Sequence, residues 1–100
     1  MPHLICYDIH KNSLRAKMSK TIIAYGLDRI NKSVYLGSIQ AQPLRELEQK
    51  LSTALAKVNH PTDSLIIISV APQAIQGMRI YGQNQLDREE LAGEKTTLII

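Results

Sequence analysis

The chain has 100 residues, the length of one domain, which can bury a modest core alone and a larger one as a dimer. Hydrophobic residues make up 44% and charged residues 21%, which argues against disorder, and a net charge of +3 is too small to indicate a nucleic-acid partner by itself. The single cysteine excludes an internal disulfide framework, and without a membrane-spanning run or a signal-peptide pattern we expect a cytoplasmic protein with no membrane partner.

The first predicted element is a strand over residues 3–9. Its apolar run is short, and apolar residues occupy both sides of the alternation, with Leu4 on one side and Ile5 on the other. This pattern is typical of a central strand that is covered on both faces. Asp8 stands at the carboxyl end of the strand beside a basic loop, where a carboxylate can bind a metal ion or lie close to a phosphate. An Asp in this place can equally be a turn former or a helix cap.

A helix is predicted next, capped by Asn12 or Ser13 and ended by Gly26, which accepts a left-handed backbone. Ile23 falls on the far side of this helix, which indicates a contact outside the monomer. The buried face is predicted from four residues at helical spacing: Leu14, Met18, Ile22 and Tyr25.

Residues 27–39 form either one long strand or a hairpin, and the hairpin is favoured because it places two strands between two helices. Its strands would be Leu27–Ile30 and Ser33–Ile39, with the turn at Asn31-Lys32. Asn31 accepts the positive φ that the first position of such a turn needs.

The second helix is predicted to open at Pro43 and to stop at Asn59-His60-Pro61. Its apolar stripe is typical of a core-facing helix rather than of a cofactor site. The stripe consists of Leu44, Leu47, Leu51, Ala54, Leu55 and Val58.

The remainder of the chain is mostly strand-like. Residues 65–70 predict a strand buried on both faces, residues 72–77 a loop or a single helical turn, and residues 78–81 a short strand. Residues 83–95 are polar, acidic and helix-forming in composition, and residues 96–100 predict an apolar last strand.

The element order β-α-β-β-α-β predicts an α+β fold, the ferredoxin-like βαββαβ sandwich, with an extra C-terminal strand. The domain would cover residues 1–82. In a monomer the apolar last strand within residues 83–100 would be an exposed sheet edge. We therefore expect a homodimer in which this acidic segment and C-terminal strand are exchanged with the partner subunit.

The cations are concentrated between residues 11 and 32, where Asp28 is the only acid. Such a cluster indicates phosphate contacts, although any one of these side chains can serve only to keep the protein soluble. Arg15 and Lys17 lie on opposite flanks of the first helix, so the cations cannot all face one way. The candidate nucleic-acid-binding residues are Lys11, Arg15, Lys17, Lys20, Arg29 and Lys32.

Several familiar sites are absent from the sequence. There is no GxxxxGK, GxGxxG, HExxH or GxSxG motif, which removes the nucleotide-cradle and serine-hydrolase interpretations. His3, His10 and His60 lack ligand spacing, so we expect surface or turn histidines rather than metal ligands. Asp8 is the candidate catalytic and metal residue. One carboxylate per chain makes a weak Mg²⁺ site, but two copies at a dimer axis could share an ion that polarises a phosphodiester or supplies hydroxide.

Five short segments, in this order and spacing, resemble the Cas2 family, the small CRISPR-associated proteins of spacer acquisition. They are Tyr7-Asp8, Tyr25-Gly26, the run from Arg29 to Tyr35, the Leu-rich second helix and Asp63-Ser64, and the resemblance spans roughly residues 3–81. Tyr35 stands where Phe is more usual, and the loop His10-Lys11-Asn12 is less acidic and less Arg-rich than is common in the family.

The resemblance implies a ferredoxin-fold homodimer whose C-terminal strand crosses to the partner. It also implies a place between two dimers of the CRISPR integrase, holding the DNA to be inserted, while integration chemistry belongs to the integrase. Metal-dependent endonuclease activity on RNA or DNA is implied for some members, with Asp8 as the magnesium ligand. The acidic segment 87–94 with strand 96–100 is expected to face the integrase.

Three hypotheses follow from the sequence. The first is a homodimeric, double-stranded-DNA-binding scaffold of the spacer-acquisition complex. The second is a Mg²⁺-dependent endonuclease that acts on RNA or DNA through Asp8, or a toxin-type ribonuclease of related fold. The third is a small-molecule-binding regulatory ferredoxin-like domain, which would show no salt-dependent affinity for DNA.

Overall fold

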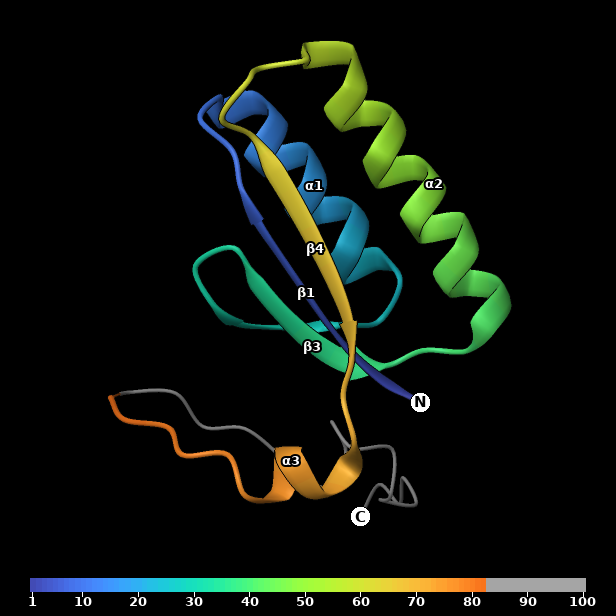
Figure 1. The fold of residues 1–100 in the computed structure, drawn as a ribbon, viewed down its shortest axis with the longest axis vertical. Helices are drawn as coiled ribbons and strands as arrows, with labels where there is room; N and C mark the ends of the chain where they lie inside the picture. The colour runs from blue at the N-terminus through green and yellow to red at the C-terminus, as the bar shows by residue number, and fades with distance from the viewer. Residues whose placement is uncertain (83–100) are drawn as a thin grey trace.

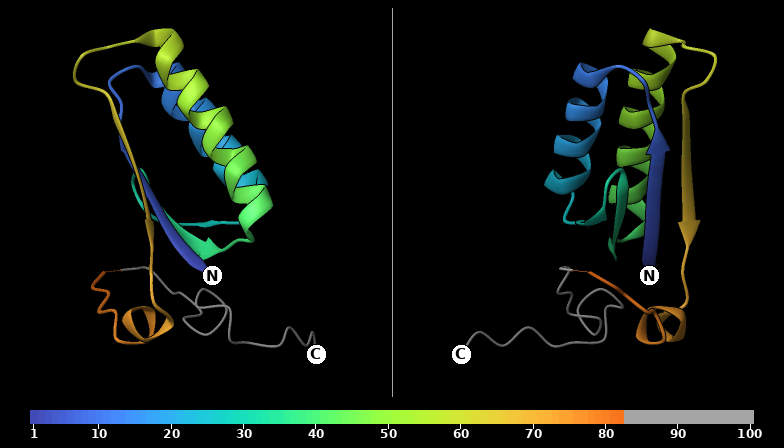
Figure 2. Two further views of the ribbon diagram at one scale, coloured as in Figure 1. Left: turned by 45° about the vertical axis from the view of Figure 1, so that its right-hand side comes forward. Right: turned by 90° about the vertical axis from the view of Figure 1, so that its left-hand side faces the viewer.

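The computed structural model describes residues 1–82 as an antiparallel sheet with two long helices on one of its faces (Figures 1 and 2). The strand order β2-β3-β1-β4 makes β1 a central strand, as its apolar residues predicted, and the α+β sandwich confirms the expected fold class. The elements are β1 (Pro2–Asp8), α1 (Asn12–Ala24), β2 (Asp28–Asn31), β3 (Val34–Ser38), α2 (Ala41–Val58), β4 (Ser64–Ser69) and α3 (Pro72–Gln76).

The main core lies between the sheet and the two long helices. Both predicted apolar stripes face it, so the helical periodicities are confirmed. Alternate residues of β1 enter it because strand side chains point to opposite faces in turn. The buried side chains from β1 and the residue after it, from α1 and from α2 are Ile5, Tyr7, Ile9, Leu14, Met18, Ile22, Leu47, Leu51 and Ala54.

The other side of the sheet, which we call the open face, is only partly covered. In-register pairing across β1 places on it Leu4, Cys6, Val34, Leu36, Ile66 and Ile68. Ile75 of α3 is buried against Leu36 at one end, but Ile66 and Ile68 are each 49% exposed. The prediction that residues 65–70 are buried on both faces is therefore wrong for the described structure, because no helix covers this side of β4 and β4 is the edge strand.

The C-terminal ends of α1 and α2 agree with the sequence prediction, whereas the N-terminal end of α1 differs from it. Gly26 has φ +94° after α1, and Asn59 has φ 51° as the left-handed cap of α2, as their residue types indicated. At its start, α1 has Lys11 in the cap position without a side-chain hydrogen bond, so the predicted capping by Asn12 or Ser13 is wrong. The helix begins one residue earlier than such a cap requires.

The hairpin is confirmed, but its turn is Lys32-Ser33, one residue further along than the predicted Asn31-Lys32. Ser33, not Asn31, takes the positive φ, at 59°. Asn31 stays in β2 and its side-chain oxygen accepts the backbone N–H of Lys32 at 2.7 Å. A register irregularity between Arg29 and Asn31 accounts for the displacement, since it adds a residue to β2 ahead of the turn.

The end of the described chain contains α3 and then residues 77–82, which form no strand, so the predicted strand over 78–81 is wrong. The predictions for residues 83–95, 87–94 and 96–100, including the exchanged C-terminal strand, fall outside the described residues. In the part of the chain that is described, no helix is both long and apolar enough to cross a membrane.

Candidate functional site

Asp8 occupies the predicted place at the carboxyl end of the central strand. It is exposed and stands opposite Ser64 of β4. Strand alternation puts its side chain on the open face, with Leu4 and Cys6, and away from the helices. Within residues 1–82 its carboxylate makes no hydrogen bond or ion pair. The carboxylate oxygens therefore remain available to a cation or to a second subunit.

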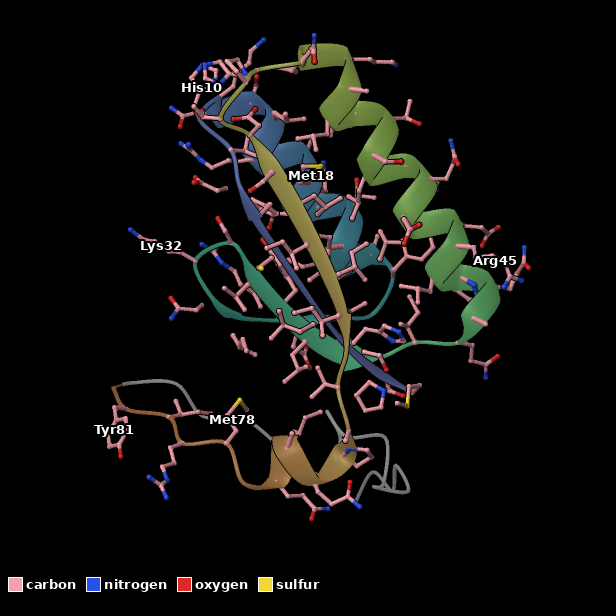
Figure 3. The ribbon with its side chains drawn as sticks, viewed as in Figure 1. His10, Met18, Lys32, Arg45, Met78 and Tyr81 are labelled. Atoms are coloured by element: carbon pink, nitrogen blue, oxygen red, sulfur yellow. The ribbon has the colours of Figure 1, made fainter. Side chains whose placement is uncertain are left out.

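Three of the predicted cations line one cavity of about 520 Å³ between α1 and the hairpin, which we call the hairpin groove. Arg15 comes from α1, and Arg29 and Lys32 come from the hairpin, with the Lys32 side chain projecting outward at the turn (Figure 3). The Arg15 guanidinium donates to the carbonyl oxygens of Ile9 at 2.8 Å and His10 at 3.1 Å, which holds it against the end of β1.

The floor of the hairpin groove carries two tyrosine hydroxyls. The hydroxyl oxygens of Tyr7 and Tyr35 are 3.0 Å apart, and the Tyr7 hydroxyl also donates to the Arg15 carbonyl oxygen at 3.3 Å. Burial, followed by the hydrogen bond with Tyr35, raises the pKa of Tyr7 to about 12. Tyr7 thus stays neutral at ordinary pH and does not diminish the positive charge that Arg15 and Arg29 bring to the groove.

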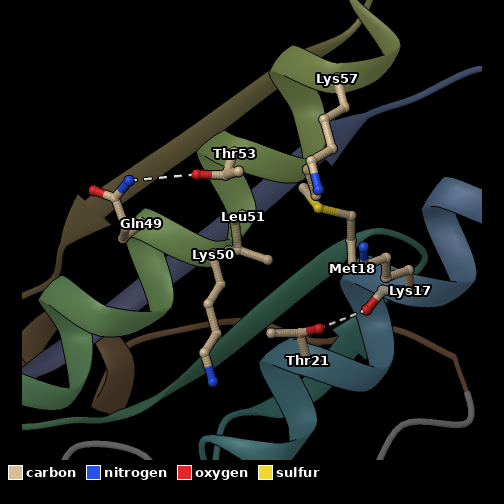
Figure 4. A pocket seen from close by; sticks show the side chains of 9 residues that line it. Lys17, Met18, Thr21, Gln49, Lys50, Leu51, Thr53 and Lys57 are labelled. Carbon is tan, nitrogen blue, oxygen red and sulfur yellow. Dashed lines mark hydrogen bonds between the residues drawn. The ribbon is translucent and has the colours of Figure 1, made fainter.

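A second cationic surface lies between α1 and α2, where two adjoining cavities of about 310 and 250 Å³ share Lys17 and Lys57; we call it the interhelical groove. Lys11 lines its outer part, and Figure 4 shows Lys17, Lys50 and Lys57 around its inner part. The Lys50 ammonium also lies 5.0 Å from the centre of the Tyr25 ring, an attractive cation–π contact.

The two grooves flank α1, so Arg15 and Lys17 face different surfaces, as their helical positions predicted. Lys20 lines neither groove, and the structure does not join Asp8 to any of the cations, because it projects from the other face of the sheet. Sequence reasoning missed Lys50 and Lys57. Their spacing of seven residues, two helical turns on one side of α2, was the available signal.

A further cluster that sequence reasoning missed joins His10, His60 and Asp63 beyond the end of β1. The two imidazole rings have centroids 3.7 Å apart, and one ligand atom from each of the three residues lies within 4.8 Å of the others. His10 and His60 do lie in loops, as expected, but the structure brings them together with Asp63, which the sequence analysis did not predict. The available signal was that His10 follows β1 while Asp63 precedes β4, two strands that pair antiparallel.

Comparison with known proteins gives a consistent result. A family model described as CRISPR associated protein Cas2 matches residues 1–78. The CRISPR-associated endoribonuclease Cas2 2 of Pyrobaculum aerophilum is 28% identical, over 78% of this chain and 97% of that protein. The CRISPR-associated endoribonuclease Cas2 1 of Methanospirillum hungatei is 30% identical over 67% of each chain.

Two further matches bear on assembly and fold. A CRISPR-associated endonuclease Cas1/endonuclease Cas2 fusion of Thermoproteus tenax is 38% identical over 56% of this chain and 21% of its own length, so this chain spans about a fifth of that fusion. The crystal structure of Streptococcus pyogenes Cas2 at pH 6.5 superimposes with a TM-score of 0.70, covering 82% of this chain and 100% of that one. At 18% identity this last likeness is one of fold.

Proposed function

This chain belongs to the CRISPR-associated protein Cas2 family, and from that premise we propose that it is a homodimeric scaffold that binds double-stranded DNA for the CRISPR integrase during spacer acquisition. The name of the Thermoproteus tenax relative, which joins Cas1 and Cas2 endonucleases in one chain, supports an intimate partnership with the Cas1 protein. Residues 83–100 are proposed to carry the contact with that partner.

The observation that supports DNA binding best is the composition of the two grooves. Cations from α1 and the residue before it, from α2 and from the hairpin line them, and no Asp or Glu of residues 1–82 does. A surface with this charge attracts phosphates whatever the base sequence, and it releases counterions when it binds them. The cations involved are Lys11, Arg15, Lys17, Arg29, Lys32, Lys50 and Lys57.

The open face of the sheet supports the homodimer. Ile66 and Ile68 stand on it side by side, each 49% exposed, next to Leu4 and Cys6. Burying such apolar area contributes about 25 cal/mol per Å². We propose that a second copy of the chain packs on this face, and that each subunit then carries its grooves on the helix side, away from the interface.

A second candidate activity, Mg²⁺-dependent endonuclease, rests on the exposed carboxylate of Asp8, which has no hydrogen-bond or ion-pair partner within residues 1–82. The Asp8 carboxylate is a suitable ligand for Mg²⁺, since this ion is commonly held by one or two carboxylates together with phosphate oxygens and water. Bound there, the ion would polarise a phosphodiester. Because Asp8 lies on the open face, packing two copies through that face would bring two such carboxylates toward a common axis.

Fluorescence anisotropy of labelled duplex DNA, titrated with the full chain at several salt concentrations, tests the scaffold function. Each neutralised phosphate should add about −0.9 to the slope of log K against log salt. Two double variants, Arg29→Gln/Lys32→Gln and Lys17→Gln/Lys57→Gln, each remove two cations from one groove. Because the dimer loses two cations from each subunit, we expect each variant to lower the slope by about 2 to 4 in magnitude and to weaken binding similarly for all sequences.

Arg45→Gln is the matched control, because Arg45 lies on α2 outside both grooves, where it donates to Gln42 at 2.6 Å (Figure 3). It should bind DNA like the parent protein. A salt-independent or undetectable affinity for DNA would reject the scaffold and favour the regulatory ligand-binding domain. Equal loss in Arg45→Gln and in the groove variants would mean that net charge alone, not the grooves, determines binding.

A further inference from the structure

The loop after β1 and the loop before β4 meet through the Asp63 carboxylate. Its Oδ1 atom accepts the backbone N–H of His10 at 3.0 Å. The same oxygen lies 3.7 Å from Nδ1 of His10 and 3.7 Å from Nδ1 of His60. A single carboxylate oxygen thus stands between two imidazoles that come from segments about fifty residues apart in the chain.

The other oxygen of this carboxylate is the unusual feature. The Asp63 side chain is only 2% exposed, and Oδ2 is buried without a hydrogen-bond partner among the described residues. A buried carboxylate oxygen that lacks a partner is costly, and such groups in native proteins call for a water molecule or an ion. The other oxygen of the same carboxylate lies 3.7 Å from a nitrogen of each of two imidazoles, which are themselves good metal ligands.

We propose that His10, His60 and Asp63 bind a divalent transition metal ion of the Zn²⁺ type, with water as the fourth ligand. Two imidazoles and one carboxylate select such ions over Mg²⁺, which prefers oxygen ligands alone. Ligand atoms around a tetrahedral zinc lie about 3.3 to 3.5 Å apart. The two nitrogen–oxygen separations of 3.7 Å are within a few tenths of an ångström of that geometry.

Thr62 orients the His60 ring, since its hydroxyl lies 2.9 Å and its backbone nitrogen 3.3 Å from Nδ1. The Thr62 backbone N–H donates to Nδ1 of His60, so this nitrogen has a free lone pair, and a metal ion bound through Nδ1 would replace the contacts with Thr62. Nδ1 is also the atom of each imidazole that lies 3.7 Å from Asp63 Oδ1, so the geometry presents this nitrogen of both rings to the ion.

The site is separate from the nuclease candidate and does not depend on the proposed function. Asp8 is two residues from His10 but supplies none of the three ligands. The role of the metal site is to hold the β1–α1 loop against the α2–β4 loop, at the end of the sheet where Asp8 stands. Metal would therefore stabilise the fold even in a protein that neither binds nor cleaves nucleic acid.

Zinc titration of the metal-free full chain tests the proposal. Calorimetry measures the binding, and thermal unfolding measures the change in stability. We expect one Zn²⁺ per chain and a rise in Tm of roughly 10 °C when free zinc is about 100 times the dissociation constant. Co²⁺ should give the visible spectrum of a tetrahedral nitrogen–oxygen site. Mg²⁺ at the same concentration should leave Tm unchanged.

His60→Gln is the decisive variant, since the side chain is 33% exposed and, within residues 1–82, the ring hydrogen-bonds only with Thr62, so the fold should survive its loss. We expect zinc affinity to fall at least about tenfold in this variant and in Asp63→Asn. His3→Gln and Asp8→Asn are the controls and should bind zinc like the parent protein. Unchanged zinc binding in His60→Gln, its loss in either control, or no stoichiometric binding at all would overturn the proposal.

Discussion

At the scale of single residues, the buried hydroxyl of Tyr7 makes stability depend on pH at the alkaline end. Because burial raises the pKa of Tyr7 from 10.0 to about 12, the folded protein holds the phenolic proton more tightly than the unfolded chain does. The stabilisation is fully present below pH 10 and is lost as pH rises toward 12. We expect the free energy of unfolding to fall by on the order of 2 kcal/mol over this window, as measured by denaturant unfolding.

The matched variants are Tyr7→Phe, which removes the titrating hydroxyl, and Tyr81→Phe, which alters a side chain that is 87% exposed. The decline in stability should become shallower in the first and stay as in the parent protein in the second. If Tyr7→Phe lost stability over this window as steeply as the parent, the alkaline sensitivity would come from other groups.

Asp8 is the other residue whose surroundings yield a prediction. Its exposed carboxylate has no hydrogen-bond partner in residues 1–82, so Asp8→Asn should leave fold and DNA affinity unchanged. We expect Mg²⁺-dependent cleavage of RNA or DNA to fall at least about 100-fold, because the amide cannot supply the charge that holds the ion. Cleavage is measured on labelled RNA and duplex DNA, with a chelator as the metal-free reference.

Asp28→Asn serves as the control, since Asp28 is an exposed acid on β2. It should cleave as the parent protein does. Equal cleavage by Asp8→Asn and the parent would mean that the activity comes from a contaminant or from another residue, and the endonuclease function through Asp8 would be wrong.

At the scale of helices and strands, the sequence predicted what periodicity encodes. The apolar run around Leu4 and Ile5 identified β1 as central, and the two helical stripes identified the faces that became core. The turn was misplaced because the choice between Asn31 and Ser33 depends on the register irregularity in β2, which arises from pairing with β3 and not from either residue type. The residues of β4 are apolar on both of its sides, so their alternation could not show that no helix covers one side within the described residues.

The candidate site was predictable only in part, because long-range pairing assembles it. The cations of the first helix and the hairpin were visible as a charge cluster, and five of the six line a groove. The cluster of His10, His60 and Asp63 was not visible as a local motif, since His10 and Asp63 meet only when Asp8 pairs with Ser64, and the one signal was the expected pairing of the two strands beside them. No local spacing carries that information.

At the scale of the whole molecule, the cations and the open face lie on opposite sides of the sandwich. The grooves lie along α1, on the helix side, while Ile66 and Ile68 face away from the helices. Two copies that pack through their open faces would expose four grooves outward, and a duplex would then meet the cations of both subunits. Dimerisation and DNA affinity should therefore change together.

The double variant Ile66→Glu/Ile68→Glu tests this link. Placing two carboxylates in an apolar interface should raise the dimer dissociation constant by roughly 100-fold or more, which light scattering of the purified protein would detect. Ile23→Glu is the control, because Ile23 is an equally exposed residue, 51%, on α1, and it should leave the dimer intact.

The monomeric variant should still fold, since both positions are already half exposed in one chain, and circular dichroism would verify this. It should bind duplex DNA with a salt slope about half that of the parent dimer, because each binding unit then carries half the phosphate contacts. A dimer that survived Ile66→Glu/Ile68→Glu but dissociated with Ile23→Glu would place the interface on the helix side. The two subunits would then cover the grooves with each other, and the proposed route for DNA would be closed.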